Sequence, residues 1–352
     1  MKNYREIFSR FDTQANVTEI KPLGNGLIND TFIVRTVGSS PDYVMQRVNT
    51  AIFTNPDVLM NNIVAVTEHI RAKLEAAGTD DIDRKVLRFI PDKTTGKYYY
   101  TDADCDTWRL SVFIPGTVTI DYINETTAEC VGRTFGNFQA MLADLDAPLE
   151  ESIPKFHNIE FRLDQLREAV ENDAAGRLHQ VRDVADTLLS YADEMSAAEV
   201  LHREGKLPKR ICHCDTKANN ILFDADGSSL CVIDLDTVMP SYIFSDYGDF
   251  MRTAAATLPE DNPDIDKVAL RPEIHEAFTR GYLEAATFLT PLEKEMLPYG
   301  ACLFAYMQAV RFFADYLNGD TYYKTAYPEH NLVRTRNQLA LFLDMRRYFG
   351  MK

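Results

Sequence analysis

The sequence predicts an α+β protein with a strand-rich N-terminal part and a mostly helical C-terminal part. Up to residue 115, short stretches rich in β-branched and aromatic residues alternate with turn residues, a pattern typical of strands. Beyond that point, apolar residues recur at helical spacing over long stretches. Pro115 and Gly116 form a natural hinge, so we expect an N-terminal lobe over 1–115 and a C-terminal helical lobe over 116–352.

The N-terminal part is expected to hold one long helix among several strands. Between residues 55 and 77, apolar residues three or four positions apart mark one face of a helix: Leu59, Ile63, Val66, Ile70 and Leu74. The stretches with strand character lie at 17–22, 31–37, 42–48, 86–90, 98–101 and 108–114.

In the C-terminal part, the expected helices are interrupted by a short hairpin. Residues 220–224 and 229–233 are expected to form two strands, joined by a turn at Ala225-Asp226-Gly227-Ser228. The helices are expected at roughly 124–145, 159–173, 176–203, 244–257, 272–287, 292–317 and 330–348.

One motif carries most of the functional information. His213, Asp215 and Asn220 lie in the order H-x-D-x-x-x-x-N, and Asp234 ends an apolar run 14 residues later. ATP-dependent phosphoryl transfer uses this order for its base and its metal ligands. The reaction needs a carboxylate near the acceptor hydroxyl and oxygen ligands for Mg²⁺ around one γ-phosphate. The motif therefore predicts a kinase whose base is Asp215.

The expected hairpin explains how the metal ligands would meet. It returns Asp234 to the side of Asn220, so that a carboxylate and an amide oxygen could hold Mg²⁺ together. Asp236 is either a further ligand or a residue that only holds the loop. Lys217, on the loop that carries Asp215, could neutralise charge on the transferred phosphate as its bond breaks.

The same residues allow two other interpretations. Asp234 and Asp236 also fit the D-x-D-x-[TV] motif of haloacid-dehalogenase-like phosphatases, in which the first Asp is the nucleophile. That motif normally opens its domain, whereas 233 residues precede it here. Cys212 and Cys214 flank His213 and suggest zinc, but no second pair lies nearby, which favours buried free thiols in a reducing cytosol. His213 is expected to hold the loop through hydrogen bonds.

The order of these residues resembles the aminoglycoside phosphotransferase and choline kinase superfamily over nearly the whole chain. Within that group, four segments are similar to the bacterial N-acetylhexosamine 1-kinases: Gly24-Asn-Gly-Leu-Ile-Asn-Asp-Thr-Phe, Val44-Met-Gln-Arg-Val-Asn, His213-Cys-Asp-Thr-Lys-Ala-Asn-Asn and Ile233-Asp-Leu-Asp-Thr-Val-Met-Pro. The resemblance implies a two-lobed protein-kinase-like fold, ATP and Mg²⁺. It also implies phosphorylation of the anomeric hydroxyl of N-acetylglucosamine or N-acetylgalactosamine, an acceptor that motif spacing does not show.

Nucleotide-binding residues are expected in the N-terminal lobe. Gly24 and Gly26 lie between the first two expected strands, where a glycine-rich loop could cover ATP phosphates through backbone N–H groups. Arg47 stands where protein kinases carry the phosphate-binding lysine of their third strand, and an arginine can hold phosphate oxygens with two donors. A surface arginine at a strand end is the alternative. Glu68, on the following helix, is the candidate to orient Arg47.

Thr237 and Arg311 resemble sugar-contacting positions of the N-acetylhexosamine kinases. An arginine among aromatic residues is costly to bury without a partner, so Arg311 is expected to meet a ligand or a carboxylate such as Asp315. Asp246 and Asp249 open an expected helix, where they either cap it or support the metal-binding loop.

Composition narrows the classes of partner. The formal net charge of −16 argues against nucleic acid and anionic membrane, because both are bound by clustered Lys and Arg. No run of about 18 apolar residues suggests a membrane span, and the start lacks an apolar signal-peptide core, so a cytoplasmic location is expected. The mechanism would also suit choline, homoserine, a thioribose or an aminoglycoside as acceptor. A non-catalytic nucleotide-binding regulator is the other class, although base, amide ligand and metal carboxylate are all present.

Overall fold

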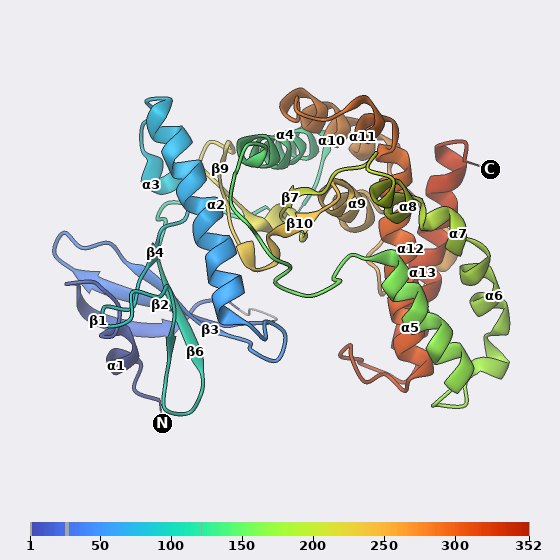
Figure 1. Ribbon diagram of the computed structural model, residues 1–352, viewed down its shortest axis with the longest axis horizontal. Coiled ribbons are helices and arrows are strands. Elements are labelled where there is room, and N and C mark those ends of the chain that lie inside the picture. Colours follow the sequence, from blue (N-terminus) through green and yellow to red (C-terminus); the bar gives the residue numbers. More distant parts are fainter. Residues whose placement is uncertain (1, 25–27, 121, 352) are drawn as a thin grey trace. The chain divides into compact units, whose positions relative to one another are not determined.

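The computed structural model describes residues 2–24, 28–120 and 122–351. Their contacts divide the chain into two compact units, each of which contains several separate segments. Unit 1 comprises Met1–Thr119, Asp144–Pro154 and Asn220–Met239. Unit 2 comprises Ile120–Ala143, Lys155–Asn219 and Pro240–Lys352. The first unit contains the large sheet and the second contains most of the helices (Figure 1).

The sheet of unit 1 has six strands, with β5 paired to β6 and the others in the order β1-β2-β3-β6-β4. All six strands that the sequence predicts are present, although β4 and β5 are only two residues long. Adjacent strands of this sheet pair antiparallel throughout. The bounds are β1 (Asn16–Pro22), β2 (Asp30–Val37), β3 (Tyr43–Val48), β4 (Phe89–Ile90), β5 (Tyr100–Thr101) and β6 (Thr107–Val112).

Alternation along these strands gives the sheet two different faces. Val34, Met45 and Leu110 point to one face and are fully buried there. The short helix α1 (Tyr4–Phe8), which the sequence analysis did not predict, packs its Ile7 and Phe8 against the same cluster. The strands form because this side of the pleat removes a contiguous apolar surface from water.

The long predicted helix of unit 1 is α2 (Pro56–Ala76). The Asn55 side chain accepts hydrogen bonds from the first-turn amides, and Pro56 occupies a position where no amide donor is needed. Four of the five apolar residues that predicted the helix are buried, which confirms the expected face. The one-turn helix α3 (Ile82–Lys85) follows and was not predicted.

The predicted hairpin of unit 1 is confirmed as β8 (Ile221–Phe223) and β9 (Ser229–Val232). Ile221 lies opposite Val232, and the Ile233 amide donates to the Asn220 carbonyl at 2.9 Å. Asn220 and the residue after Ile233 are therefore at the same end of the hairpin.

Unit 2 is built from helices together with β7 (Arg210–Cys212), which pairs with β10 (Met239–Ser241). Five predicted helices are confirmed within a few residues, and the last of them, α13, lies alongside α12 (Leu297–Leu317) (Figure 1). Their bounds are α4 (Glu125–Leu142), α5 (Ile159–Asn172), α9 (Phe244–Thr253), α10 (Pro272–Ala285) and α13 (His330–Tyr348).

Two predicted helices are broken, so their prediction as continuous elements was wrong. Residues 292–317 form α11 (Pro291–Glu295) and α12 (Leu297–Leu317), because Pro298 has no amide to continue the helix. Within 176–203, the Ser196 hydroxyl donates to the Ala192 carbonyl at 2.8 Å where one helix ends. The pieces there are a 3-10 turn (Leu178–Gln180), α6 (Arg182–Ser190), α7 (Ala192–Met195) and α8 (Ala197–Arg203).

Close helix packing in unit 2 depends on glycine at two crossings. A Cβ at Gly281 of α10 would lie 2.1 Å from the Glu129 carbonyl oxygen of α4. A Cβ at Gly248 of α9 would lie 2.4 Å from the Gly300 carbonyl oxygen of α12. Any side chain at either position would push the helices apart, so Gly281 allows α10 to pack closely on α4 and Gly248 allows α9 to pack closely on α12.

Candidate functional site

The H-x-D loop of unit 2 is held by a buried carboxylate on α9. Asp246 accepts hydrogen bonds from the backbone amides of His213 at 3.0 Å and Cys214 at 2.7 Å. The Gln139 side chain of α4 donates to the same carboxylate at 2.7 Å. Asp246 is fully buried, and burial raises the pKa of its carboxyl against the effect of nearby His213. The position thus supports the loop, as one of the two sequence-based alternatives expected.

A second α9 carboxylate holds the next turn of the same loop. Asp249 accepts from the Thr216 amide at 3.0 Å and pairs with Arg252 at 2.9 Å. Arg252 also contacts Glu260 at 2.5 Å. Burial raises the pKa of Asp249. The nearby Arg252 charge acts to lower this pKa, and the Asp215 carboxylate acts to raise it. Asp246 and Asp249 lie on α9 at the spacing of one turn, so a single helix fixes both ends of the loop.

His213 is part of this support. Its ring is fully buried and lies edge-on to the rings of Phe135 and Phe138, 5.4 and 6.0 Å between centroids. Its Nδ1 accepts a hydrogen bond from the Asp215 amide at 3.3 Å. The geometry matches the structural role expected for His213.

The two residues with expected catalytic roles on the loop are partly open to solvent. The Asp215 side chain is 28% exposed and that of Lys217 is 42% exposed. Lys217 Nζ lies 2.6 Å from Asp215 Oδ1. Burial alone would lower the pKa of Lys217. The Asp215 and Asp249 carboxylates outweigh this effect and raise the pKa of Lys217, so its ammonium group stays charged. The loop therefore presents one carboxylate and one ammonium group on a rigid base.

The candidate metal ligands lie in unit 1, at the same end of the β8–β9 hairpin. Asn220 is buried and Asp234 is exposed. Asp234 has a left-handed backbone, with φ 59° and ψ 55°, a conformation that Asp adopts more readily than most residues. Such a conformation turns the chain sharply from β9 into a 3-10 turn (Leu235–Thr237).

The donor set of this hairpin fits Mg²⁺. It offers an amide oxygen and one exposed carboxylate, and Mg²⁺ is usually held by one or two carboxylates together with water and phosphate oxygens. Across 2–24, 28–120 and 122–351, no three His, Cys, Asp or Glu side chains cluster as a metal-binding group. An amide oxygen and one carboxylate would leave the other positions around Mg²⁺ to water and phosphate oxygens.

Asp236 has a different environment from Asp234, because it is buried in a polar network of unit 1. Its Oδ1 lies 2.5 Å from Arg109 Nη1 of β6, and its Oδ2 accepts from Asn29 at 2.6 Å. Ser152 donates to its carbonyl at 2.9 Å, and Gln46 of β3 accepts from Arg109 Nε at 3.0 Å. With both carboxylate oxygens engaged, these contacts favour the loop-holding alternative for Asp236. Thr237 ends the same turn.

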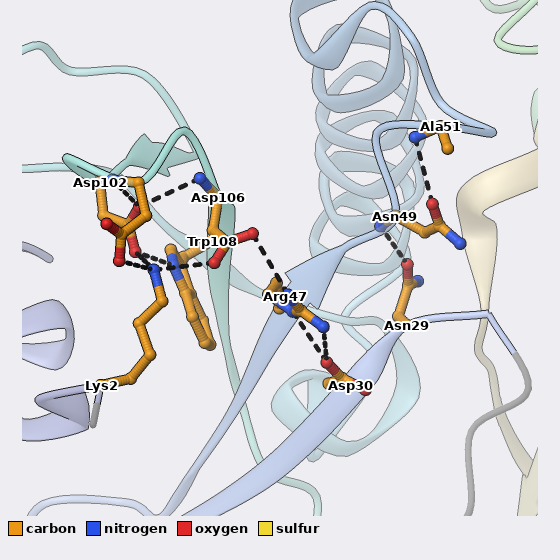
Figure 2. A network of polar contacts seen from close by, with 10 residues as sticks. Lys2, Asn29, Asp30, Arg47, Asn49, Ala51, Asp102, Asp106 and Trp108 are labelled. Carbon is orange, nitrogen blue, oxygen red and sulfur yellow. Dashed lines mark hydrogen bonds and ion pairs between the residues drawn. The ribbon is translucent and has the colours of Figure 1, made fainter.

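Arg47 and Glu68 are not brought together. Arg47 lies opposite Asp30 in the β2–β3 ladder, and its Nε and Nη1 contact Asp30 at 2.8 Å and Asp106 at 3.2 Å (Figure 2). The Arg47 side chain is 44% exposed, and Glu68 is an exposed residue of α2. This placement favours the surface alternative for Arg47. The alternation of β3 explains it, because Arg47 shares a face with Met45, whereas Gln46 shares the other face with Arg109.

The glycine-rich loop is described only in part. Gly24 has a positive φ of 68°, which suits a glycine, while Gly26 lies outside the described residues. Asn29 begins the chain after this loop, and its side-chain oxygen accepts from the Asn49 amide at 2.9 Å (Figure 2). Through Asn29, the end of the loop is tied to Asp236 within unit 1.

Arg109, the buried arginine in the polar network around Asp236, was not predicted from the sequence. It is 3% exposed and Asp236 is 4% exposed. The available signal was a charged residue in the centre of Thr-Trp-Arg-Leu-Ser-Val, where a strand otherwise alternates apolar and small residues. A buried arginine requires a carboxylate partner, but the sequence does not show which of the 53 acidic residues provides it.

Arg311, the second expected acceptor contact, lies on α12 in unit 2. Its Nη1 donates to Gln308 at 3.1 Å. In the described part of the chain, no carboxylate lies within ion-pair distance of Arg311, so the expected alternative of a bridge to Asp315 does not form. Asp315 instead accepts from backbone amides of residues 321–323.

Comparisons with known proteins agree with this architecture. Three solved structures resemble almost the whole chain: an aminoglycoside phosphotransferase from Alicyclobacillus acidocaldarius (13% identity, TM-score 0.63, 100% and 98% of the two chains), a choline kinase from Cryptosporidium parvum (14%, 0.58, 99% and 93%) and a spectinomycin phosphotransferase in complex with ADP and spectinomycin (11%, 0.57, 100% and 99%). The protein thus has the protein-kinase-like fold of small-molecule kinases, with a β-rich and a helical unit.

The sequence itself identifies the family. Residues 19–291 match the model of the phosphotransferase enzyme family, which is well over half of the chain. The protein belongs to this family. Among the described residues, no helix combines the length and apolar character that crossing a bilayer requires.

Proposed function

We propose that this phosphotransferase transfers the γ-phosphate of ATP to the anomeric hydroxyl of an N-acetylhexosamine. The observation that carries the phosphotransfer step is the Asp215–Lys217 pair on a loop that two buried carboxylates of α9 hold in place. A catalytic base is effective only when its position is fixed before the substrate arrives. The ADP complex of the similar spectinomycin phosphotransferase supports the choice of an adenine nucleotide.

In this proposal each unit contributes its own part of the chemistry. Asp215 accepts the proton of the acceptor hydroxyl and orients that oxygen, while the Lys217 ammonium stabilises charge on the transferred phosphoryl group. Asn220 and Asp234 provide the oxygen ligands for Mg²⁺, which when bound neutralises charge on the phosphates. Gly24 and Gly26 would cover the nucleotide with backbone amides. Arg47 is engaged by Asp30 and Asp106, and Glu68 does not contact it, so neither residue has a main role in this proposal.

The acceptor class rests on similarity of four sequence segments to N-acetylhexosamine 1-kinases, together with Thr237 and Arg311 as polar contacts for the sugar. A pocket that pairs a polar group of its substrate rejects an analogue without that group, because its own donors are then left unpaired. N-acetylglucosamine or N-acetylgalactosamine should therefore be better acceptors than glucose and galactose.

A different acceptor is the second candidate, since structural relatives include a choline kinase and aminoglycoside phosphotransferases. The net charge of −16 would suit a cationic acceptor. ATP consumption should be measured across hexosamines, plain hexoses, choline, homoserine, a thioribose and aminoglycosides. Activity confined to the amino alcohols or aminoglycosides would refute the hexosamine assignment and keep the kinase. Absence of turnover with every acceptor would favour a non-catalytic nucleotide-binding protein.

The position of phosphorylation has its own test. A methyl glycoside, whose anomeric oxygen is blocked, should not be phosphorylated, whereas a sugar blocked at its 6-hydroxyl should be. Phosphorus NMR of the product should show a sugar 1-phosphate. Equal phosphorylation of the methyl glycoside and the free sugar would overturn the anomeric assignment.

A further inference from the structure

A cavity of about 140 Å³ lies in unit 2 beside α5, the end of α12 and the loop that follows α12. Its lining combines charged and aromatic side chains, including Arg162, Arg311, Tyr322 and Tyr323. The two helices beside the cavity, α5 and α12, pack against each other within unit 2 (Figure 1). Tyr322, one of its lining residues, is 70% exposed to solvent.

Arg311 is positioned to serve a ligand in this cavity. Its guanidinium lies over the rings of Phe156 and Tyr323, with 5.5 and 5.6 Å to the ring centroids. Gln308 is its hydrogen-bond partner, at Nη1. Stacking between two rings fixes the plane of a guanidinium and leaves its edge for hydrogen bonds. Arg311 therefore retains donors that a ligand can use.

Arg162 of α5 lines the same cavity. Its Nη2 donates to the Phe156 carbonyl at 2.8 Å and its Nη1 to Gln165 at 2.9 Å. Both acceptors are neutral, and no carboxylate of the described chain lies within ion-pair distance of Arg162. Two guanidinium groups thus line one cavity, and within the described ranges neither has a carboxylate partner.

The one carboxylate in the lining does not neutralise them. Asp315 is buried and accepts hydrogen bonds from the amides of Thr321, Tyr322 and Tyr323 at 2.8–3.0 Å. The Asn331 side chain donates to it at 2.9 Å. Asp315 fixes the loop that closes one side of the cavity. These four donors solvate its carboxylate, which therefore forms no ion pair with either arginine.

The local electrostatics show the consequence of two unpaired charges. Burial and the neighbouring Arg311 lower the pKa of Arg162 to about 10. Burial, Arg311, Arg162 and Arg252 lower the pKa of His157, which is stacked on Phe156, well below its usual value. The imidazole is therefore neutral near pH 7 and adds no charge. A positive cavity in a chain of net charge −16 is unexpected unless it binds an anion.

Helix α9 links the surroundings of this cavity to the H-x-D loop of the same unit. His157, which is stacked on the Phe156 ring that also contacts Arg311, has its Nδ1 3.0 Å from Ser245 Oγ on α9. The next residue of α9, Asp246, holds the His213 and Cys214 amides of the loop that carries Asp215. The same helix therefore contacts both the loop and the side chains that pack against Arg311.

We infer that Arg162 and Arg311 bind an anionic group of the acceptor, so that the preferred substrate is an N-acetylhexosamine carrying a phosphate, sulfate or carboxylate away from its anomeric carbon. This inference rests on the proposed function for the identity of the sugar. The anion site itself rests on the two guanidinium groups. Phosphate, sulfate and carboxylate share the geometry that an arginine edge recognises, and the test below separates them.

The first experiment compares kcat/KM for N-acetylglucosamine with its 6-phosphate, its 6-sulfate and its 3-O-lactyl carboxylate derivative. At least one anionic sugar should exceed the neutral one by about 10- to 100-fold, the effect of a charge-assisted contact. The ratio should fall several-fold in Arg162→Gln and Arg311→Gln. Arg167→Gln is the matched control, because Arg167 lies on the same helix and pairs with Asp164 at 2.9 Å. Its ratio should stay at the wild-type value.

A binding measurement tests the site without turnover. Sodium sulfate should raise the Tm of the wild type more than sodium chloride of equal ionic strength, and the difference should shrink in Arg162→Gln but not in Arg167→Gln. Arg162→Lys keeps the positive charge and should retain part of this difference in Tm. It replaces Arg162→Gln in the measurement if the glutamine variant does not fold.

The two measurements separate failure of this inference from failure of the proposed function. If the neutral sugar is phosphorylated as well as every anionic sugar, the inference is wrong and the hexosamine kinase stands. If no hexosamine is phosphorylated, the proposed function is wrong, and the sulfate measurement decides the anion site. Equal sulfate stabilisation of the wild type and both glutamine variants would overturn it.

Discussion

Arg109 and Asp236 form a buried ion pair that ties β6 to the turn after Asp234, with Nη1 and Oδ1 2.5 Å apart. The two residues are 127 positions apart and both lie in unit 1. Asn29, which follows the glycine-rich loop, hydrogen-bonds the same carboxylate. The expected phosphate-binding loop and the expected metal-binding turn therefore share one polar anchor.

Breaking this pair should destabilise the protein strongly. Arg109→Met leaves the Asp236 charge buried without its partner, and removal of one member of such a pair typically costs about 3–5 kcal/mol. Urea denaturation should show this loss. Arg35→Met is the control, because Arg35 forms a half-exposed pair with Asp42 on the same sheet and should cost about 0–1 kcal/mol. Equal losses in both variants would show that the buried pair has no special role.

Replacing the expected base should abolish turnover and leave the fold intact. Asp215→Asn keeps the shape of the side chain but cannot accept the hydroxyl proton, so kcat should fall by roughly 10²–10⁴. Nucleotide affinity and Tm should stay close to wild type, since the loop is held by Asp246 and Asp249. Near wild-type kcat in this variant would exclude Asp215 as the base.

The metal assignment predicts a nucleotide defect that depends on magnesium. Asp234→Ala should weaken binding of Mg·ATP far more than binding of ATP in the presence of a chelator, because the carboxylate acts through the metal. Calorimetric titration measures both. Asp226→Ala, in the exposed turn of the same hairpin, should change neither. An equal loss with and without magnesium would contradict a metal-ligand role for Asp234.

Asp246 should affect stability and catalysis because it holds the loop that carries Asp215. Asp246→Asn places an amide NH₂ or a single acceptor before two backbone amides and Gln139, leaving at least one buried group unsatisfied. We expect a loss of about 1–3 kcal/mol in stability and a lower kcat. Asp164→Asn on the exposed side of α5 is the control, expected within about 0.5 kcal/mol of wild type. An active, fully stable Asp246→Asn enzyme would refute the support role.

One pH effect follows from Glu199, a buried carboxyl that accepts from Tyr242 Oη at 2.8 Å. Burial raises the pKa of Glu199 above its ordinary value, against the effect of the Tyr242 hydrogen bond. A carboxyl with a raised folded pKa stabilises the fold below its unfolded pKa, and this contribution is lost as pH rises through the folded value.

Glu199→Gln should accordingly raise Tm at pH 7, where the wild type buries a charge, and the gain should disappear near pH 4. Thermal melts from pH 4 to pH 8 measure it. Glu168→Gln, at an exposed position, should show no such trend. A gain that is the same at every pH would mean that the Glu199 charge is not its cause.

The sequence determined most of the helices and strands, together with the hairpin that carries Asn220 and Asp234. Strand and helix positions follow from local periodicity, and the spacing of Asn220 and Asp234 around a short turn was enough to place them at one end of a hairpin. These features depend on neighbours within about 15 residues, which a single sequence displays. The breaks at Ser196 and Met296 were missed, because the periodicity continues through them.

The tertiary structure alone decided which charges meet. Arg47 was expected to bind phosphate with the help of Glu68, but the register of the sheet places it against Asp30 and Asp106. The same register places Arg109 on the other face, against Asp236. In unit 2, Arg162 and Arg311 line the same cavity although they are 149 positions apart in the sequence. Pairing between distant residues depends on how whole elements pack, and no local pattern in the chain encodes the partner.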